Sequence, residues 1–260
     1  MGDPARAMSK EDALSELQDL QANGVILLEG AVSAQQVSLD GWDPVNHERQ
    51  DGNVAGVVIR YLASGTAQSG QPSGGAAPDR LDPRNALALV RLCQWLAESF
   101  SVFELYHLGI SGGGVDAQGN PRRDCHGQGR AVDFVGVKYT AEDDSAVVIT
   151  VNDDWGAVST AVTPGGDWPP GTGSDVSYRL DDPEADPVVS GFFRDLYQFI
   201  ASEWQDRSDG PDPAGDETTI GERSFIMHPD HPATAPGTPH GREAHRNHIH
   251  MQIGVTGTAT

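Results

Sequence analysis

The sequence predicts an α+β fold with a mainly antiparallel sheet and flanking helices. Two long segments carry apolar residues at helical spacing, and several short segments rich in Val, Ile and Phe have the character of strands. These helices and strands do not alternate along the chain as they do in parallel α/β folds. We therefore expect neighbouring strands to run mostly antiparallel.

Both long helices are predicted to begin at an Asp-Pro pair. Asp82 and Asp186 suit an N-cap position, and the proline after each fits the first helical turn. Apolar residues then recur at helical spacing over residues 86–100 and 189–204. The apolar faces are expected to cover one face of the sheet, and the aromatic residues of the second helix to form core rather than a platform for substrate.

The strands of the main sheet are predicted at residues 102–110, 131–138, 146–152 and 248–255. Upstream, Ser9 suits the N-cap of a shorter helix that ends at Gly24. Two further strands are predicted at 25–28 and 54–61.

Composition divides the chain near residue 80. Residues 63–80 are rich in Gly, Ser, Ala and Pro without an apolar period, which is typical of a linker. We therefore expect an N-terminal part over residues 1–80, with a helix, a strand pair and this linker, and a main domain over residues 81–260.

The charge and apolar content of the chain exclude some classes of partner. The formal net charge is −21, from 38 acidic and 17 basic residues, so its surface should repel nucleic acid and anionic lipid. Its apolar segments are all shorter than the roughly 18 residues of a membrane-spanning helix. We therefore expect neither a nucleic-acid partner nor a membrane span.

Imidazole and carboxylate side chains gather in two distant segments. His248 and His250 lie two residues apart in a predicted strand, so they share one face. In the segment 126–133, two glycines oppose a helix and favour a turn that returns His126 toward the strand of Asp133. A carboxylate on that strand needs a charge partner, which is either a metal ion or an arginine, Arg123 or Arg130.

These residues resemble the motifs of the LAS metallopeptidases, a group with zinc D-Ala-D-Ala carboxypeptidases, peptidoglycan endopeptidases and hedgehog signalling domains. The resemblance covers roughly residues 81–255, and it is carried by His126, Gly129, Ala131, Asp133, His248 and His250. It implies a LAS/hedgehog-like core in which His126, Asp133 and His250 bind Zn²⁺. It also implies that His248 is a catalytic neighbour, and His245 completes a His-x-x-His-x-His pattern.

The resemblance implies a zinc-dependent hydrolase of peptidoglycan stem peptides or cross-links, either a DD-carboxypeptidase or an endopeptidase. Three protein ligands leave one zinc position for a water whose pKa falls to about 7. Some relatives use a glutamate as base, but position 247 is Asn, so His248 or His245 is expected to move the proton. Arg123 (or its neighbour Arg122) is expected to hold a substrate carboxylate.

Two alternatives stay open at this level. A catalytically silent zinc-containing binding module of the hedgehog type would keep the metal without the chemistry. A structural zinc would need a fourth protein ligand, either Cys125 or His245.

The remaining features carry weaker predictions. The start of the sequence lacks the apolar segment of a signal peptide, so we expect synthesis in the cytoplasm and delivery to the cell wall or periplasm by a non-Sec route, such as lysis, a phage particle or an injection device. Residues 206–244 are polar and read as a lid or a disordered segment, in which His228 and His231 are expected at the surface. Cys93 is expected to be a buried thiol, and a Cys93–Cys125 bridge is left open.

Overall fold

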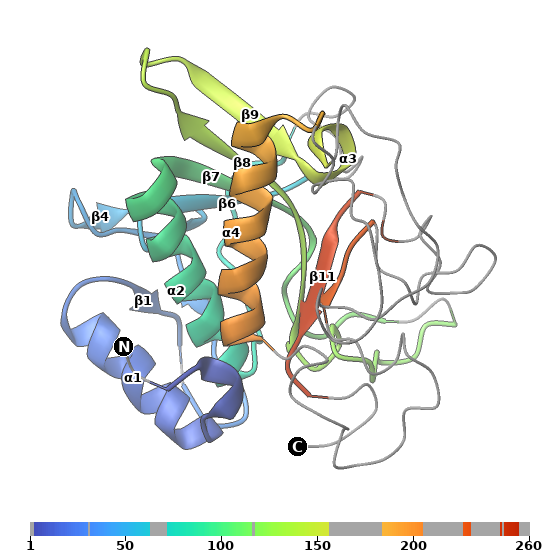
Figure 1. Ribbon diagram of the computed structural model, residues 1–260. Helices are drawn as coiled ribbons and strands as arrows, with labels where there is room; N and C mark the ends of the chain where they lie inside the picture. The colour runs from blue at the N-terminus through green and yellow to red at the C-terminus, as the bar shows by residue number, and fades with distance from the viewer. Residues whose placement is uncertain are drawn as a thin grey trace.

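The computed structural model describes residues 3–30, 32–62, 72–115, 118–155, 184–204, 226–229, 245 and 247–254. These residues form a mixed α+β structure around a seven-stranded sheet (Figure 1). The predicted fold class is therefore confirmed at the level of a mostly antiparallel sheet with a few helices. No helix in the described ranges combines the length and apolar character needed to cross a membrane.

The order of the strands in the sheet is β10-β11-β8-β7-β6-β5, with β9 also paired to β8. Their bounds are β5 Asn53–Val54, β6 Val57–Tyr61, β7 Val102–Gly109, β8 Ala131–Thr140, β9 Ala146–Thr150, β10 Ile226–Met227 and β11 Ile249–Gln252. Only β6 and β7 pair in parallel among the described strands. A parallel pair needs a long crossover, and the helix α2, Pro83–Phe100, lies between these two strands in the chain.

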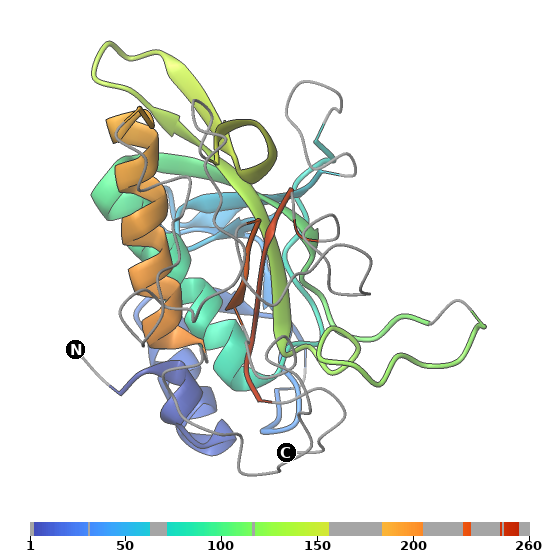
Figure 2. The same ribbon diagram turned by 45° about the vertical axis from the view of Figure 1, so that its right-hand side comes forward.

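The other helices are short or lie beside α2. They are η1 Ala5–Ala7, α1 Lys10–Ala22, α3 Val151–Asp154 and α4 Pro187–Glu203. The predicted N-caps are present, because the side chains of Ser9, Asp82 and Asp186 each accept a hydrogen bond from a backbone N–H of the first turn. Figures 1 and 2 show α1, α2 and α4 on one side of the sheet.

Two small two-stranded sheets complete the N-terminal part. One pairs β1 Leu27–Leu28 with β2 Leu39–Asp40, and the other pairs β3 Trp42–Asp43 with β4 Glu48–Arg49. Trp42 Nε1 donates a hydrogen bond of 2.8 Å to the carbonyl of Gly24, the residue at which α1 was predicted to end. These contacts connect the short strands of the N-terminal part to one another and to the end of α1.

The main core lies between the sheet and the helices. Val132 and Phe134 of β8 and Ile249 and Met251 of β11 are fully buried in it. Phe193 of α4 is also in this core, as expected for the aromatic residues of that helix. Because side chains alternate along a strand, the residues between these apolar positions face the other side of the sheet.

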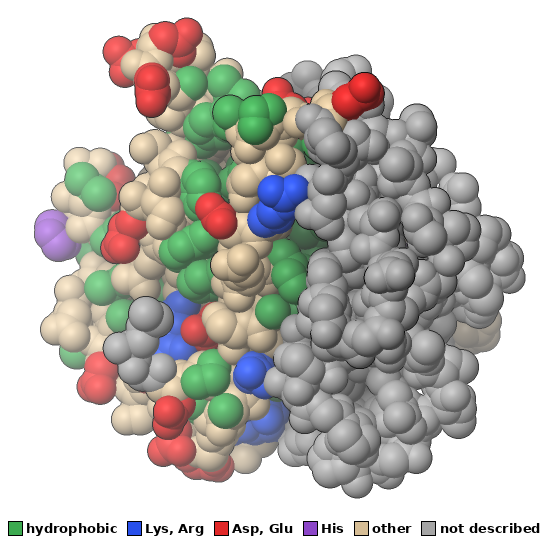
Figure 3. All heavy atoms as spheres, viewed as in Figure 1, with side chains coloured by type: hydrophobic (Ala, Val, Ile, Leu, Met, Phe, Trp, Pro, Cys, Tyr) green, Lys and Arg blue, Asp and Glu red, His purple; other side chains and the backbone are tan. Residues whose placement is uncertain are grey.

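The space-filling view shows the helix side of the molecule (Figure 3). Acidic side chains are more numerous than basic ones on the coloured part of this face, in keeping with the net charge of −21. The turn between β8 and β9 projects at the top of the view and carries the exposed residues Glu142, Asp143 and Asp144.

Two features of the N-terminal part differ from the sequence-based expectation. The predicted strand 54–61 is interrupted by a tight turn at Ala55 and Gly56, where both residues have positive φ. In addition, β6 pairs with β7, and residues after it hydrogen-bond back to it, through Ser73 N to the Tyr61 carbonyl. The N-terminal part, residues 1–80, and the part after residue 80 therefore contribute strands to the same sheet, because β6 pairs with β7.

Candidate metal centre

Three side chains from distant parts of the chain converge on the sheet face opposite the helices. One ligand atom each of His126, Asp133 and His250 lies within 4.8 Å of the others. His126 Nε2 is 3.2 Å from Asp133 Oδ2, and His250 Nδ1 is 2.8 Å from Asp133 Oδ1. This group, one carboxylate and two imidazoles, could hold a metal ion.

Strand pairing places two of the three candidate ligands. His250 on β11 is the direct partner of Asp133 on β8 in the antiparallel register. Directly opposed residues of an antiparallel pair point to the same face of the sheet, with side chains close enough to touch. The apolar neighbours Phe134 and Ile249 point to the helix side, so the alternation along both strands turns the polar pair away from the core.

A tight turn places His126. Asp124 Oδ1 accepts a hydrogen bond of 2.8 Å from Gly127 N, and Gly129 N donates one of 2.9 Å to the His126 carbonyl. Gly129 has a φ of +69°, and a Cβ there would collide with the backbone carbonyl of Arg80. The turn therefore requires glycine at position 129.

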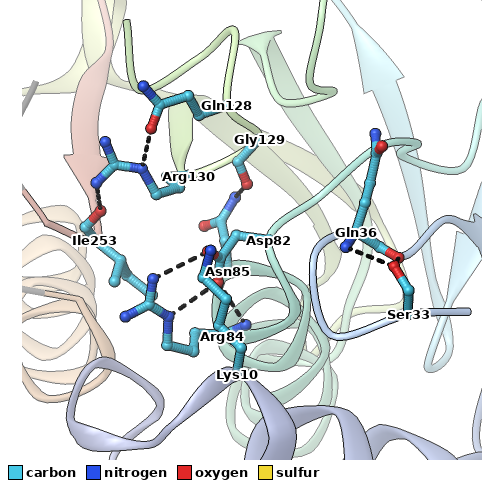
Figure 4. Close-up of polar contacts among 10 residues, drawn as sticks. All are labelled: Lys10, Ser33, Gln36, Asp82, Arg84, Asn85, Gln128, Gly129, Arg130 and Ile253. Carbon is cyan, nitrogen blue, oxygen red and sulfur yellow. Dashed lines mark hydrogen bonds and ion pairs between the residues drawn. The ribbon is translucent and has the colours of Figure 1, made fainter. Parts of the chain in front are cut away.

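A buried arginine anchors the end of this turn (Figure 4). Arg130 Nε donates to Gln128 Oε1 at 2.8 Å, and Arg130 Nη1 donates to the Ile253 carbonyl at 2.6 Å. Asn85 Nδ2, from α2, donates to the Gly129 carbonyl at 2.9 Å. These bonds tie the turn to both α2 and the end of β11, and they give Arg130 a structural role.

Gly109, at the end of β7, lies against the side chains of His126 and Asp133. A Cβ at this position would lie 3.2 Å from Asp133 Oδ2 and 3.3 Å from the ring of His126. The absence of a side chain at this strand end therefore leaves room for the His126–Asp133 pair.

The charges of the site are mutually stabilising. Burial acts to raise the pKa of Asp133, but hydrogen bonds and the charges of His126 and His250 outweigh it and hold the pKa well below its ordinary value. Burial acts to lower the pKa of His250, but the hydrogen bond and charge of Asp133 raise it overall. The carboxylate is therefore ionised and oriented toward positively charged or metal-coordinating partners.

His248 lies beside the three candidate ligands without belonging to their group. Its Nε2 is 3.6 Å from Asp133 Oδ1, and its Nδ1 is 2.9 Å from the side-chain oxygen of Asn247. Burial lowers the pKa of His248, although the charge of Asp133 acts in the opposite direction. His248 is thus neutral near pH 7 and presents one ring nitrogen to the site.

His245 lies further out in the same cluster. Its ring centroid is 5.1 Å from that of His248 and 6.2 Å from that of His250. Neither His245 nor Cys125 belongs to the group of ligand atoms around Asp133. Cys93 and Cys125 are both buried and free, so the bridge left open from the sequence is not formed.

Other predicted residues lie in different surroundings. Arg123 is exposed, and its backbone carbonyl accepts a hydrogen bond of 2.6 Å from Gln128 Nε2. Arg122 pairs with Asp124, with a distance of 3.1 Å between Arg122 Nε and Asp124 Oδ2. The structure thus leaves Arg123 as an exposed cation near the turn, and its role toward substrate stays a prediction.

The prediction for His228 was wrong. Its side chain is fully buried and stacks on Trp155, with ring centroids 5.0 Å apart. The polar composition of residues 206–244 suggested a surface position, but His228 directly follows the buried residues Ile226 and Met227 and packs against aromatic residues of other segments. His231 and most of the proposed lid at residues 206–244 lie outside the described residues.

Sequence reasoning missed three residues of the site: Gly109, Asn247 in its contact with His248, and Gln252. Gln252 Oε1 is 2.9 Å from His250 Nε2. A usable signal existed for Gln252, because alternation along the strand puts it on the face of His248 and His250. No such signal marked Gly109, because its closeness to Asp133 depends on the pairing of β7 with β8.

Comparisons with known proteins identified no relative of the chain. No protein-family model matches the chain, and no curated protein and no solved structure matches it.

Proposed function

We propose that the chain is a zinc-dependent peptidase of the LAS type that hydrolyses peptide bonds of peptidoglycan, as a DD-carboxypeptidase or an endopeptidase. One observation carries the proposal: His126, Asp133 and His250 converge within 4.8 Å although the chain separates them widely. They do so in the order and spacing of the motifs that suggested this family.

The residues at the site fit a zinc ion. Imidazole nitrogen and carboxylate oxygen are common zinc ligands, and three protein ligands are typical of a catalytic site. Asp133 is mostly buried, with 19% of its side chain exposed, and a carboxylate in such a position needs cationic partners. When bound, zinc would supply an activated water near neutral pH and polarise the scissile carbonyl.

His248 is the residue of this chain that we assign to proton transfer. The side-chain oxygen of Asn247 only accepts hydrogen bonds, so the proton of neutral His248 lies on Nδ1. The lone pair is then on Nε2, the nitrogen that lies 3.6 Å from Asp133 Oδ1 at the site. With its pKa lowered by burial, His248 is unprotonated near pH 7 and can accept a proton from the attacking water.

His245 and Arg123 take supporting roles in the proposal. His245 lies behind His248, with ring centroids 5.1 Å apart, where it can exchange a proton with solvent or with His248. Arg123 is an exposed cation within the turn that precedes His126, and it would bind the carboxylate of a stem peptide.

The test is digestion of purified peptidoglycan by the purified chain, with mass spectrometry of the new peptide ends. We expect cleavage by the wild-type chain at one zinc per chain, and no cleavage by His126→Ala or after zinc removal by a chelator. His47→Ala is the matched control, because His47 is exposed and far along the chain from the motif. A chain that binds zinc stoichiometrically and cleaves no peptidoglycan would instead be a binding module, and a chain without metal affinity would contradict the whole proposal.

A further inference from the structure

Gln252 is a buried polar residue that contacts one of the three ligand side chains. It lies two residues after His250 on β11 and is 6% exposed. Its Oε1 is 2.9 Å from His250 Nε2, and its Nε2 donates a hydrogen bond of 2.9 Å to the carbonyl of Gly254. Both ends of the amide are therefore engaged.

These two contacts require a proton on Nε2 of His250. The Gly254 carbonyl can only accept, so the NH₂ group of Gln252 must face it. The Gln252 oxygen then faces His250, and because this oxygen also only accepts, His250 Nε2 must be the donor. The nitrogen that faces the site is Nδ1, which lies 2.8 Å from Asp133 Oδ1. In the metal-free chain Nδ1 donates to this carboxylate, and its proton would leave when a metal binds there.

We propose that Gln252 is a positioning residue for the metal: it holds the Nε2–H of His250 and so directs the Nδ1 lone pair into the site. This inference rests on the proposed function, because it concerns the same zinc ion. A hydrogen-bond acceptor behind a ligating histidine fixes the ring orientation and raises its basicity, and removing such an acceptor typically lowers metal affinity about 10–100-fold.

The backbone gives this arrangement its rigidity. Gly254 is the residue after Ile253, whose N–H donates a hydrogen bond of 3.0 Å to the Arg130 carbonyl. Arg130 Nη1 in turn donates to the Ile253 carbonyl at 2.6 Å. The acceptor for Gln252 is thus held by the same contacts that anchor the turn of His126, so both imidazoles are oriented by one hydrogen-bonded unit.

The test measures zinc affinity, by competition with a chromophoric chelator, for wild type, Gln252→Leu and Gln252→Glu. We expect Gln252→Leu to bind zinc about 10–100-fold more weakly. Gln252→Glu should recover most of the affinity, because its carboxylate still accepts from His250 Nε2. Gln21→Leu is the matched control: Gln21 also accepts one hydrogen bond, of 2.7 Å from Leu28 N, but it lies on α1 and should leave the affinity unchanged.

A second measurement needs no variant. Nitrogen-15 NMR of the zinc-loaded wild type should show His250 protonated at Nε2 and coordinated through Nδ1, and the opposite pattern would overturn the inference. Equal losses in Gln252→Leu and Gln252→Glu, or wild-type affinity in Gln252→Leu, would also overturn it.

The outcomes separate this inference from the proposed function. If wild type binds no zinc, both fail. If wild type binds zinc and Gln252→Leu weakens it as expected while no peptidoglycan is cleaved, the inference stands and the peptidase proposal fails.

Discussion

His250 and Asp133 are direct cross-strand partners, and His250 Nδ1 lies 2.8 Å from Asp133 Oδ1. The contact joins β11, near the end of the described chain, to the first half of β8. Because it depends on strand register, the pair is as precisely placed as the sheet itself, unlike a contact between two loops.

Replacing Asp133 by asparagine should abolish stoichiometric zinc binding. The substitution keeps the size of the side chain and removes the negative charge that balances the metal. Zinc content after desalting, measured by atomic emission, checks this prediction, and Asp143→Asn provides the control because Asp143 is exposed on the β8–β9 turn. A full equivalent of zinc in Asp133→Asn would remove Asp133 from the ligand set.

Replacing His248 by alanine should leave zinc in place and slow turnover. His248 lies at the site without belonging to the ligand group, and loss of a proton-transfer residue typically costs about 10²–10⁴ in rate. We therefore expect kcat on a peptidoglycan fragment to fall at least about a hundredfold. If His248→Ala lost zinc and His250→Ala retained it, the two histidines would have exchanged roles.

Gly109→Ala should weaken the metal site while the chain stays folded. The new methyl group would lie 3.2 Å from Asp133 Oδ2, a distance that forces the His126–Asp133 pair to shift. Overpacking of this kind costs about 1–3 kcal/mol, and zinc affinity should fall by the corresponding factor of about 5 to 150. Chelator competition measures the affinity.

The matched glycine control is Gly191 in α4. A Cβ there meets nothing within 4 Å, so Gly191→Ala should leave zinc affinity unchanged and stabilise the helix by up to about 1 kcal/mol. A Gly109→Ala chain with wild-type affinity would show that the site accommodates the methyl group.

Asp82 should make a pH-dependent contribution to stability. Burial acts to raise its pKa, but the hydrogen bonds and charge of Arg84 and the charge of Lys10 lower it below the ordinary 3.8. A lowered folded-state pKa stabilises the chain fully above the ordinary value, and this contribution is lost as the pH falls through the folded-state pKa. Urea unfolding of the zinc-free chain should show Asp82→Asn less stable than wild type at pH 7, with a smaller difference below pH 3.8.

Asp82→Ala separates the helix cap from the ion pair. Asn can still cap α2, whereas Ala cannot, so Asp82→Ala should lose about a further 1 kcal/mol at pH 7. Equal stability of the two variants would mean that the cap contributes nothing.

The sequence predicted the parts of the structure that depend on local pattern. Asp-Pro pairs marked the starts of α2 and α4. The strand predicted at 248–255 is present as the shorter β11, Ile249–Gln252, so His250 lies on it and His248 is the residue just before it. The turn at Gly129 could also be foreseen, although the sequence did not reveal that the Arg80 carbonyl occupies the space of its missing side chain.

The parts that escaped prediction depend on contacts between distant segments. The parallel pairing of β6 with β7 unites the N-terminal part with the main sheet, and no local pattern reports it. The burial of His228 against Trp155 is of the same kind, since the composition of residues 206–244 is polar as a whole. The amide contacts of Asn247 and Gln252 depend on side-chain rotamers that are set by packing in the folded protein, so the sequence pattern does not predict them.

The alternation of β11 protects the site against an error of assembly. A slip of one residue along β8 would turn Ile249 and Met251, both fully buried, toward the polar face and drive His248 and His250 among the helices. Burying an Ile or Met side chain is worth about 1.5–3 kcal/mol, so such a mispaired chain would be strongly disfavoured even without metal. Ile249 and Met251 flank His250 on the opposite face of β11, and their burial favours the one register that places His250 beside Asp133.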